Sequence, residues 1–176
     1  MKYIITILIG TSLVLFCISC NKKENVIPTL SSASASFNES IWIANSIRGS
    51  KTDSTINISL DIDKLNEFNE PYPYESLFLH FYKSKEKQFL FTGYSIIPTA
   101  KFYTLIEQGH ASNEEFDILE SDTENNWVQI TEEKNDYKEI KGKFSLTLIK
   151  TSTGIDPNRY PDTLRIRNGE FSVTLE

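Results

Sequence analysis

The side chains best suited to proton transfer or zinc binding are the two histidines, His80 and His110. An imidazole works as a general base or a zinc ligand only with a suitable partner side chain beside it. His80 lies inside the apolar stretch 77–82 with no such partner two or four residues away, and His110 follows a glycine in a separate loop. No nucleophile elbow or comparable signature is present. The sequence therefore predicts no catalytic residue, no metal site and no cofactor.

Two acidic loops carry the oxygen ligands that calcium prefers. Residues 120–126 offer side-chain oxygens at alternating positions, and residues 156–162 repeat the arrangement around Asn158. The first loop lacks the central glycine and the bidentate glutamate of an EF-hand, and the same conclusion, that it is no EF-hand, holds for the second loop. We expect both to be solvated turns.

Three tyrosines in proline-bounded loops are the strongest candidates for binding a ligand. Tyr72 and Tyr74 alternate with prolines, and each proline holds the residue before it in an extended conformation. Tyr160 stands between an arginine and a proline in a second loop. Exposed rings beside Asn, Asp and Arg stack on sugars or grip peptides, whereas rings folded back over the sheet would only close its ends. Both interpretations stay open. Trp42 and Trp127 lie in predicted strands and are expected in the core.

The two cysteines, Cys17 and Cys20, end an N-terminal stretch that has the form of a secretion signal. One lysine precedes about fifteen uncharged residues, which is short for a bilayer span of roughly twenty and fits a signal-peptide core. Ile18-Ser19-Cys20 resembles the lipobox of bacterial lipoproteins. The resemblance implies cleavage between Ser19 and Cys20, transfer of a diacylglycerol to the Cys20 thiol, and acylation of the new amine with a fatty acid such as palmitate. The alternative is a single-pass anchor with a free Cys20.

Composition and charge narrow the class of protein. Hydrophobic residues make up 39% and charged residues 24% of the 176 residues, which excludes a disordered chain or a multi-span membrane protein. The net charge of −6 argues against a nucleic-acid partner, because phosphate binders usually carry a basic excess. With Cys17 removed and Cys20 lipidated, neither a disulfide nor thiol chemistry remains. We expect a lipid-anchored protein of the cell envelope, at the outer membrane. Its periplasmic or surface exposure and its oligomeric state stay open.

Residues 20–34 are predicted to be the lipidated cysteine and a flexible tether, and residues 35–176 one all-β domain. Alternation of apolar and polar residues in 55–63, 143–150 and 170–176 predicts strands with one buried face. Further strands are expected at 41–48, 76–83, 87–94, 101–106, 115–119, 126–132 and 162–167. Asn168-Gly169, Asn125-Asn126 and residues 84–86 are expected as turns between paired strands, and residues 63–69 as one short helical turn. We predict an antiparallel β-sandwich or flattened β-barrel of about eight to ten strands.

Three stretches resemble uncharacterised lipoproteins of Bacteroidota-type bacteria, which share a domain of unknown function. They are residues 35–44, similar to an opening hairpin with a tryptophan, residues 127–131 together with 140–144, and residues 163–171. Glu39 stands where that family has a turn glycine. The resemblance implies an all-β secreted lipoprotein and brings no activity with it.

These features favour a non-enzymatic, membrane-anchored β domain that binds a glycan, a peptide or a protein partner in the envelope. One alternative is a carrier of a small apolar ligand, with a cavity lined by Phe78, Phe89, Phe91 and Phe102. The other alternative is an envelope hydrolase that uses two carboxylates about 5–9 Å apart.

Overall fold

The computed structural model describes residues 31–93, 96–106, 111–155 and 159–176. The predicted signal peptide, Cys20, His110 and Asn158 lie outside these residues. In the part of the chain that is described, no helix has the length and apolar character needed to cross a bilayer.

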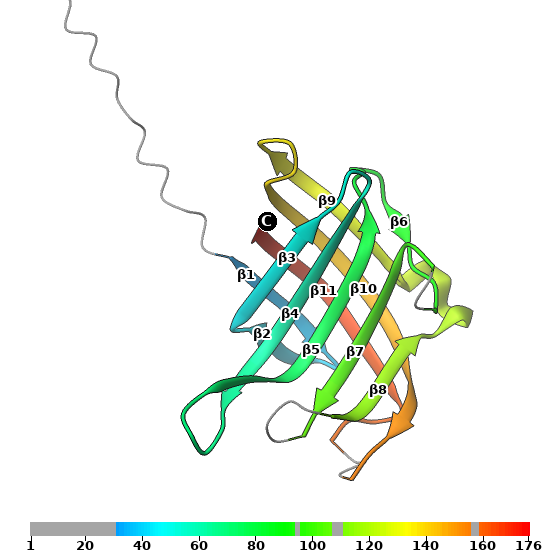
Figure 1. The fold of residues 1–176 in the computed structure, drawn as a ribbon. Helices are drawn as coiled ribbons and strands as arrows, with labels where there is room; N and C mark the ends of the chain where they lie inside the picture. The colour runs from blue at the N-terminus through cyan, green and yellow to red at the C-terminus, as the bar shows by residue number, and fades with distance from the viewer. Residues whose placement is uncertain (1–30, 94–95, 107–110, 156–158) are drawn as a thin grey trace, which may run out of the picture.

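Antiparallel strands make up almost all of the domain, which confirms the all-β prediction (Figure 1). The strands are β1 (Ser32–Phe37), β2 (Ser40–Ala44), β3 (Ser46–Lys51), β4 (Thr55–Leu65), β5 (Pro71–Tyr82), β6 (Gln88–Phe89), β7 (Thr99–Leu105), β8 (Ser112–Ile118), β9 (Trp127–Lys134), β10 (Glu139–Thr153) and β11 (Thr163–Thr174). A short 3-10 helix, η1 (Glu120–Asn125), connects β8 to β9.

The strands form one 11-stranded sheet in the order β2-β1-β11-β10-β8-β7-β5-β4-β3, with β9 beside β10 and β6 beside β9. Only Asn45 separates β2 from β3, yet β2 pairs with β1 and β3 pairs with β4. The two edges of the sheet are therefore joined by the same stretch of chain. Backbone bonds between Glu176 and both Gly49 and Lys51 add a second link. The sheet thus rolls over into a flattened, open barrel whose edge strands β2 and β3 do not pair, with β1, β2, β9, β10 and β11 as the rear wall in Figure 1.

The hydrophobic core lies between the rear wall and the strands in front of it. Every second residue of a strand contributes its side chain to this core. In β4, Ile56, Ile58 and Leu60 are fully buried, because alternate side chains of a strand point to opposite faces of the sheet. Burying each such side chain stabilises the fold by about 1.5–3 kcal/mol. Trp42 belongs to this core as predicted, whereas Trp127 is only half-buried.

The Asn168-Gly169 pair is not the predicted hairpin turn. β11 runs unbroken through both residues, and its register against β10 shifts between Phe144 and Leu146. Asn168 has a φ of 53°, in the left-handed region that a β-bulge uses. A Cβ on Gly169 would lie 2.5 Å from the Phe144 ring, so the glycine makes room for a core side chain.

Three other local predictions are also wrong. Asn125-Asn126 ends η1 rather than a hairpin, because β8 and β9 both pair with β10 and not with each other. Residues 84–86 do turn the chain, but β6 then pairs with β9 instead of β5. Residues 63–69 form the end of β4 and a turn, not a helical segment.

The opening hairpin, β1–β2, has a two-residue turn at Asn38 and Glu39, whose φ angles are 45° and 73°. Glu39 thus adopts the left-handed conformation although it is not a glycine. β1 begins at Ser32, so the predicted boundary at residue 35 falls inside the first strand. The alternation here uses Ala33 and Ala35, whose small side chains give only a weak hydrophobic signal.

Candidate functional site

Buried polar side chains gather at one end of the barrel, where the β4–β5, β7–β8 and β10–β11 connections lie (Figure 1). We call it the loop end. Glu75 of β5 stands opposite Thr104 of β7, and Thr104 stands opposite Glu114 of β8. All three side chains are buried. Three neighbouring strands therefore carry one polar row inside the barrel, and its two carboxylates need partners there.

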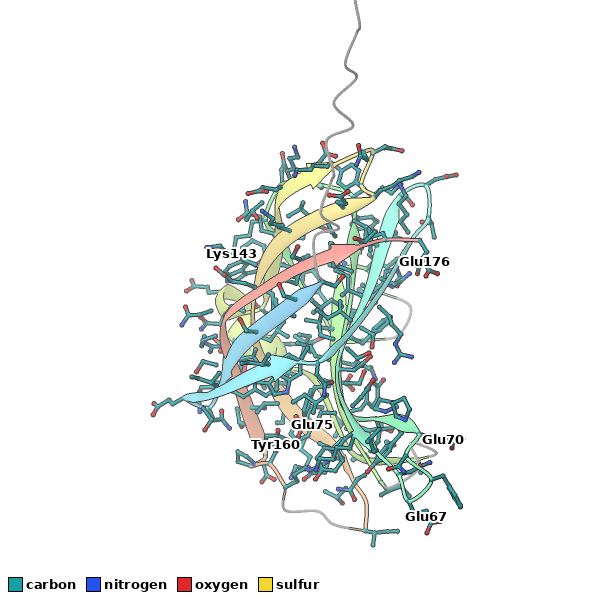
Figure 2. All side chains as sticks on the ribbon, turned by 90° about the vertical axis from the view of Figure 1, so that its left-hand side faces the viewer. Glu67, Glu70, Glu75, Lys143, Tyr160 and Glu176 are labelled. Carbon is teal, nitrogen blue, oxygen red and sulfur yellow. The ribbon has the colours of Figure 1, made fainter. Side chains whose placement is uncertain are left out.

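Glu75 is held by two aromatic donors. The indole Nε1 of Trp42 donates a hydrogen bond of 2.9 Å to the Glu75 carboxylate, and the Tyr160 hydroxyl donates a second. Burial, and then the charge of Glu75, raise the pKa of the Tyr160 phenol. The phenol therefore keeps its proton and remains a donor to the carboxylate. Figure 2 shows Tyr160 and Glu75 near each other at this end of the domain.

Glu114 is held by a buried cation. Lys150 of β10 places its Nζ 2.6 Å from Glu114 Oε1, and the two side chains are 7% and 0% exposed. The same Nζ donates a hydrogen bond of 2.6 Å to the Tyr160 carbonyl. Lys150 thus neutralises the carboxylate and fastens the β10–β11 connection to the inside of the barrel.

The Tyr160 ring points inward and closes the loop end. It meets the Phe102 ring edge-on at 5.5 Å between centroids and the Phe116 ring at 6.4 Å. Phe102 in turn contacts Phe37, which stacks on Trp42 at 4.7 Å. Tyr160 is therefore the outermost ring of an aromatic cluster.

Tyr72 and Tyr74 lie at the start of β5 and not in the predicted loop. Tyr74 lies between two cations at the rim of the loop end. Lys64 Nζ and Arg159 Cζ are each 3.1 Å from the centroid of its ring. Arg159 Nη1 also donates a 3.3 Å hydrogen bond to the Tyr74 carbonyl, and burial lowers the pKa of its guanidinium. Tyr72 is half-buried and close enough to Arg159 to influence it electrostatically. The three predicted tyrosines therefore gather around Arg159. Tyr160 faces inward, and the Tyr74 ring is covered by Lys64 and Arg159.

Exposed apolar side chains surround this rim and were not predicted. Leu65 and Phe68 next to the β4–β5 turn are 62% and 70% exposed, and Ile155 in the β10–β11 connection is 88% exposed. Alternation of apolar and polar residues shows which face of a strand is buried, but an apolar residue outside such an alternation does not show where it will lie. Only the register of the strands brings these connections to the same end.

The other candidate residues lie away from the loop end. His80 is on the outer face of β5 beside the Phe78 ring, where partial burial lowers the pKa of the imidazole. The described residues hold no cluster of His, Cys, Asp and Glu that could bind a metal. Phe102 is buried, whereas Phe89 and Phe91 are exposed and Phe78 faces outward, so the four phenylalanines do not line one space.

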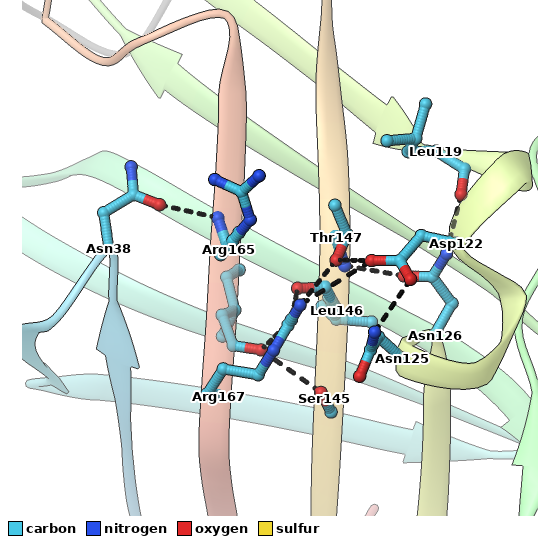
Figure 3. Close-up of polar contacts among 11 residues, drawn as sticks. Asn38, Leu119, Asp122, Asn125, Asn126, Ser145, Leu146, Thr147, Arg165 and Arg167 are labelled. Atoms are coloured by element: carbon cyan, nitrogen blue, oxygen red, sulfur yellow. Dashed lines mark hydrogen bonds and ion pairs between the residues drawn. The ribbon is translucent and has the colours of Figure 1, made fainter.

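The acidic loop 120–126 is η1 with the residue that follows it, and the side-chain oxygens of Asp122 and Asn126 bond to the sheet (Figure 3). Asp122 accepts hydrogen bonds from Thr147 at 2.5 Å and from Asn125 at 2.7 Å. Asn126 accepts one from the Thr147 backbone at 2.6 Å, and Arg167 donates another to the Thr147 hydroxyl at 2.8 Å. The loop therefore fastens η1 to β10 and β11.

Chemically, the loop end joins an inner layer of neutralised polar groups to an outer rim of aromatic, cationic and apolar side chains. The inner layer holds the barrel end closed, and the rim offers contacts to a partner. No protein-family model, no curated protein and no solved structure matches the chain. The geometry of the loop end is therefore the basis for assigning a function.

Proposed function

We propose that the protein is a lipoprotein of the cell envelope, anchored through Cys20, whose β domain binds a glycan, a peptide or a protein partner at the loop end. The observation that carries the proposal is the gathering of Tyr72 and Tyr74 from β5 and of Tyr160 from the β10–β11 connection around Arg159. Aromatic residues and arginine are enriched where binding energy is concentrated. A rigid sheet that presents such residues at one end, on its connections and the adjoining strand ends, is a common way to build a binding site.

The position of the N-terminal strand supports a loop end that faces away from the membrane. β1 begins at Ser32 opposite Ser172, near the end of β11, whereas β11 begins at the loop end with Thr163. The start of β1 and the loop end thus lie on opposite sides of the domain (Figure 1). A lipid tether that enters at Ser32 leaves the loop end directed away from the bilayer and accessible to a partner.

The partners of the buried carboxylates favour binding over hydrolysis. Glu114 is paired with Lys150, and Glu75 accepts bonds from Trp42 and Tyr160, so both acids already have partners. A glycosidase needs carboxylates that reach the substrate. The filled aromatic interior likewise weighs against a carrier that holds an apolar ligand inside the barrel.

Glycan arrays and pull-downs with the mature protein in detergent test the proposal. We expect a ligand whose affinity falls at least about tenfold in a Tyr72→Ser/Arg159→Ala variant, because the rim loses its ring and its guanidinium. The matched control is Ile41→Ala, which removes an exposed apolar side chain from β2 instead. If no ligand is found, or if the control loses affinity equally, the proposal is contradicted.

A further inference from the structure

Two phenylalanines face solvent on the segment that follows β5. Leu90 is 1% exposed and points into the core, so its neighbours Phe89 and Phe91 point outward and are 43% and 44% exposed. Ile96, in the same connection, is 48% exposed. A single aromatic side chain carries about 150–250 Å² of surface, and contiguous apolar surface of this kind marks an interaction site.

The segment holds these rings in fixed positions. Phe89 pairs with Trp127 across the β6–β9 ladder, which lies at the upper right in Figure 1. The Leu90 backbone donates to the Asn126 carbonyl at 3.0 Å, and the Phe91 backbone donates to the Pro98 carbonyl at 3.0 Å. We call Phe89, Phe91, Ile96 and Trp127 the β6 patch.

A lysine borders the β6 patch. Lys87 Nζ lies 5.4 Å from the Phe89 centroid and 4.5 Å from that of Trp127. Lys87 forms no ion pair with another described residue, unlike Lys85, which is 3.4 Å from Glu133. Residues 83–87 hold three lysines and one acid, a local basic excess on an acidic protein.

We propose that the β6 patch docks on the surface of an anionic bilayer, with Phe89 and Phe91 in the interfacial region and Lys87 at the headgroups. Aromatic rings flanked by lysines are the composition of segments that lie in a membrane interface. The inference rests on the proposed lipid anchor, which brings the domain to a bilayer. A tether over residues 21–31 reaches at most about 40 Å, enough for the domain to turn its β6 patch to the membrane.

The kind of charge beside the patch favours a bilayer over a protein partner. Protein interfaces are enriched in arginine and depleted in lysine. Here all the cations are lysines, whose long stems lie along apolar surface while the ammonium reaches the headgroups. The loop end, by contrast, places Arg159 among its rings.

Tryptophan quenching in vesicles tests the docking. The mature lipoprotein is reconstituted into phosphatidylcholine vesicles with and without phosphatidylglycerol, and the acyl chains carry bromine, which quenches nearby indoles. We expect quenching of Trp127, stronger with the anionic lipid, and none in Trp127→Phe, which retains only the buried Trp42. Flotation of the vesicles reports attachment in the same samples.

Matched variants locate the contact. Phe89→Ser/Phe91→Ser is expected to abolish the quenching, and Lys87→Gln to reduce its dependence on anionic lipid. Phe68→Ser, which removes an even more exposed ring from the loop end, should leave the quenching unchanged. Circular dichroism shows whether each variant folds, and a variant that does not fold is replaced by the milder Phe89→Tyr/Phe91→Tyr, expected to weaken the quenching.

The outcomes separate the docking from the anchor. Flotation without quenching overturns the docking alone, as does quenching that survives in the folded Phe89→Ser/Phe91→Ser variant. Failure to float overturns both. Quenching by a protein that carries no lipid on Cys20 supports the docking while overturning the anchor.

Discussion

At the scale of single residues, Lys150 has two tasks at the loop end. Its Nζ lies 2.6 Å from Glu114 Oε1 and donates to the Tyr160 carbonyl at 2.6 Å, so it both neutralises a buried acid and holds a connection. Removing one partner of a buried pair leaves an uncompensated charge, which costs about 3–5 kcal/mol. We therefore expect Lys150→Met to lower the free energy of unfolding by that amount, measured by urea titration followed by circular dichroism.

An exposed ion pair provides the control for this prediction. Lys143 and Glu170 lie 3.1 Å apart with side chains 56% and 62% exposed, so Lys143→Met is expected to cost less than about 1 kcal/mol. Adding Glu114→Gln to Lys150→Met should recover much of the loss, because the buried charge that Lys150 neutralises is then removed as well. Equal costs for the two single variants would show that the buried pair does not stabilise the loop end.

At the scale of elements, η1 is attached to the sheet through Asp122 (Figure 3). Hydrogen bonds from Thr147 and then Asn125 lower the pKa of this carboxyl below its ordinary value of 3.8. Because the folded-state pKa is the lower one, the ionised carboxylate stabilises the fold above the unfolded-state pKa. That contribution is lost as the pH falls through the folded-state pKa.

Asp122→Asn therefore has a pH-dependent effect. We expect the variant to unfold at a lower urea concentration than the wild type at pH 7, and the difference to shrink steadily below pH 3.8. Glu120→Gln, an exposed acid in the same helix, is the matched control and should not show this pattern. A difference that stays constant down to the acid limit would mean that the Asp122 charge does not hold η1.

The same scale shows what local sequence can and cannot predict. Alternation predicted β4 because Ile56, Ile58 and Leu60 report a buried face directly. Asn168-Gly169 was assigned to the wrong feature because hairpin turns and bulges both use positive φ. The choice between them depends on the Phe144 ring packed on Gly169, a contact with a distant strand that local sequence does not contain.

The candidate site, too, was predictable from the sequence only in part. Proline spacing identified Tyr72 and Tyr74, because prolines constrain their neighbours whatever the rest of the fold does. The packing of Arg159 on Tyr74 depends on how the β10–β11 connection returns to the barrel. The buried bond of Glu75 to Trp42 depends on the closure of the sheet through β2 and β3, which no local pattern encodes.

At the scale of the whole molecule, the proposed function depends on how the domain is attached. A single acyl chain gives only marginal, reversible membrane binding, whereas several chains hold a protein stably. If Cys20 carries a diacylglycerol and an N-acyl chain, one side chain decides whether the loop end and the β6 patch ever meet their partners. We therefore expect Cys20→Ala to abolish incorporation of labelled fatty acid and to prevent cleavage at Ser19–Cys20, both followed by gel electrophoresis of labelled cells.

Cys17 makes this prediction specific, because it offers a second thiol in the same segment. In the lipobox interpretation Cys17 lies within the removed signal, so Cys17→Ala should keep both the label and the cleaved mass. The single-pass alternative predicts no label and an uncleaved mass in every protein, the wild type included, so that Cys20→Ala changes neither. Label that persists in Cys20→Ala, or disappears in Cys17→Ala, would place the lipid elsewhere and remove the reason to expect the loop end to face away from a bilayer.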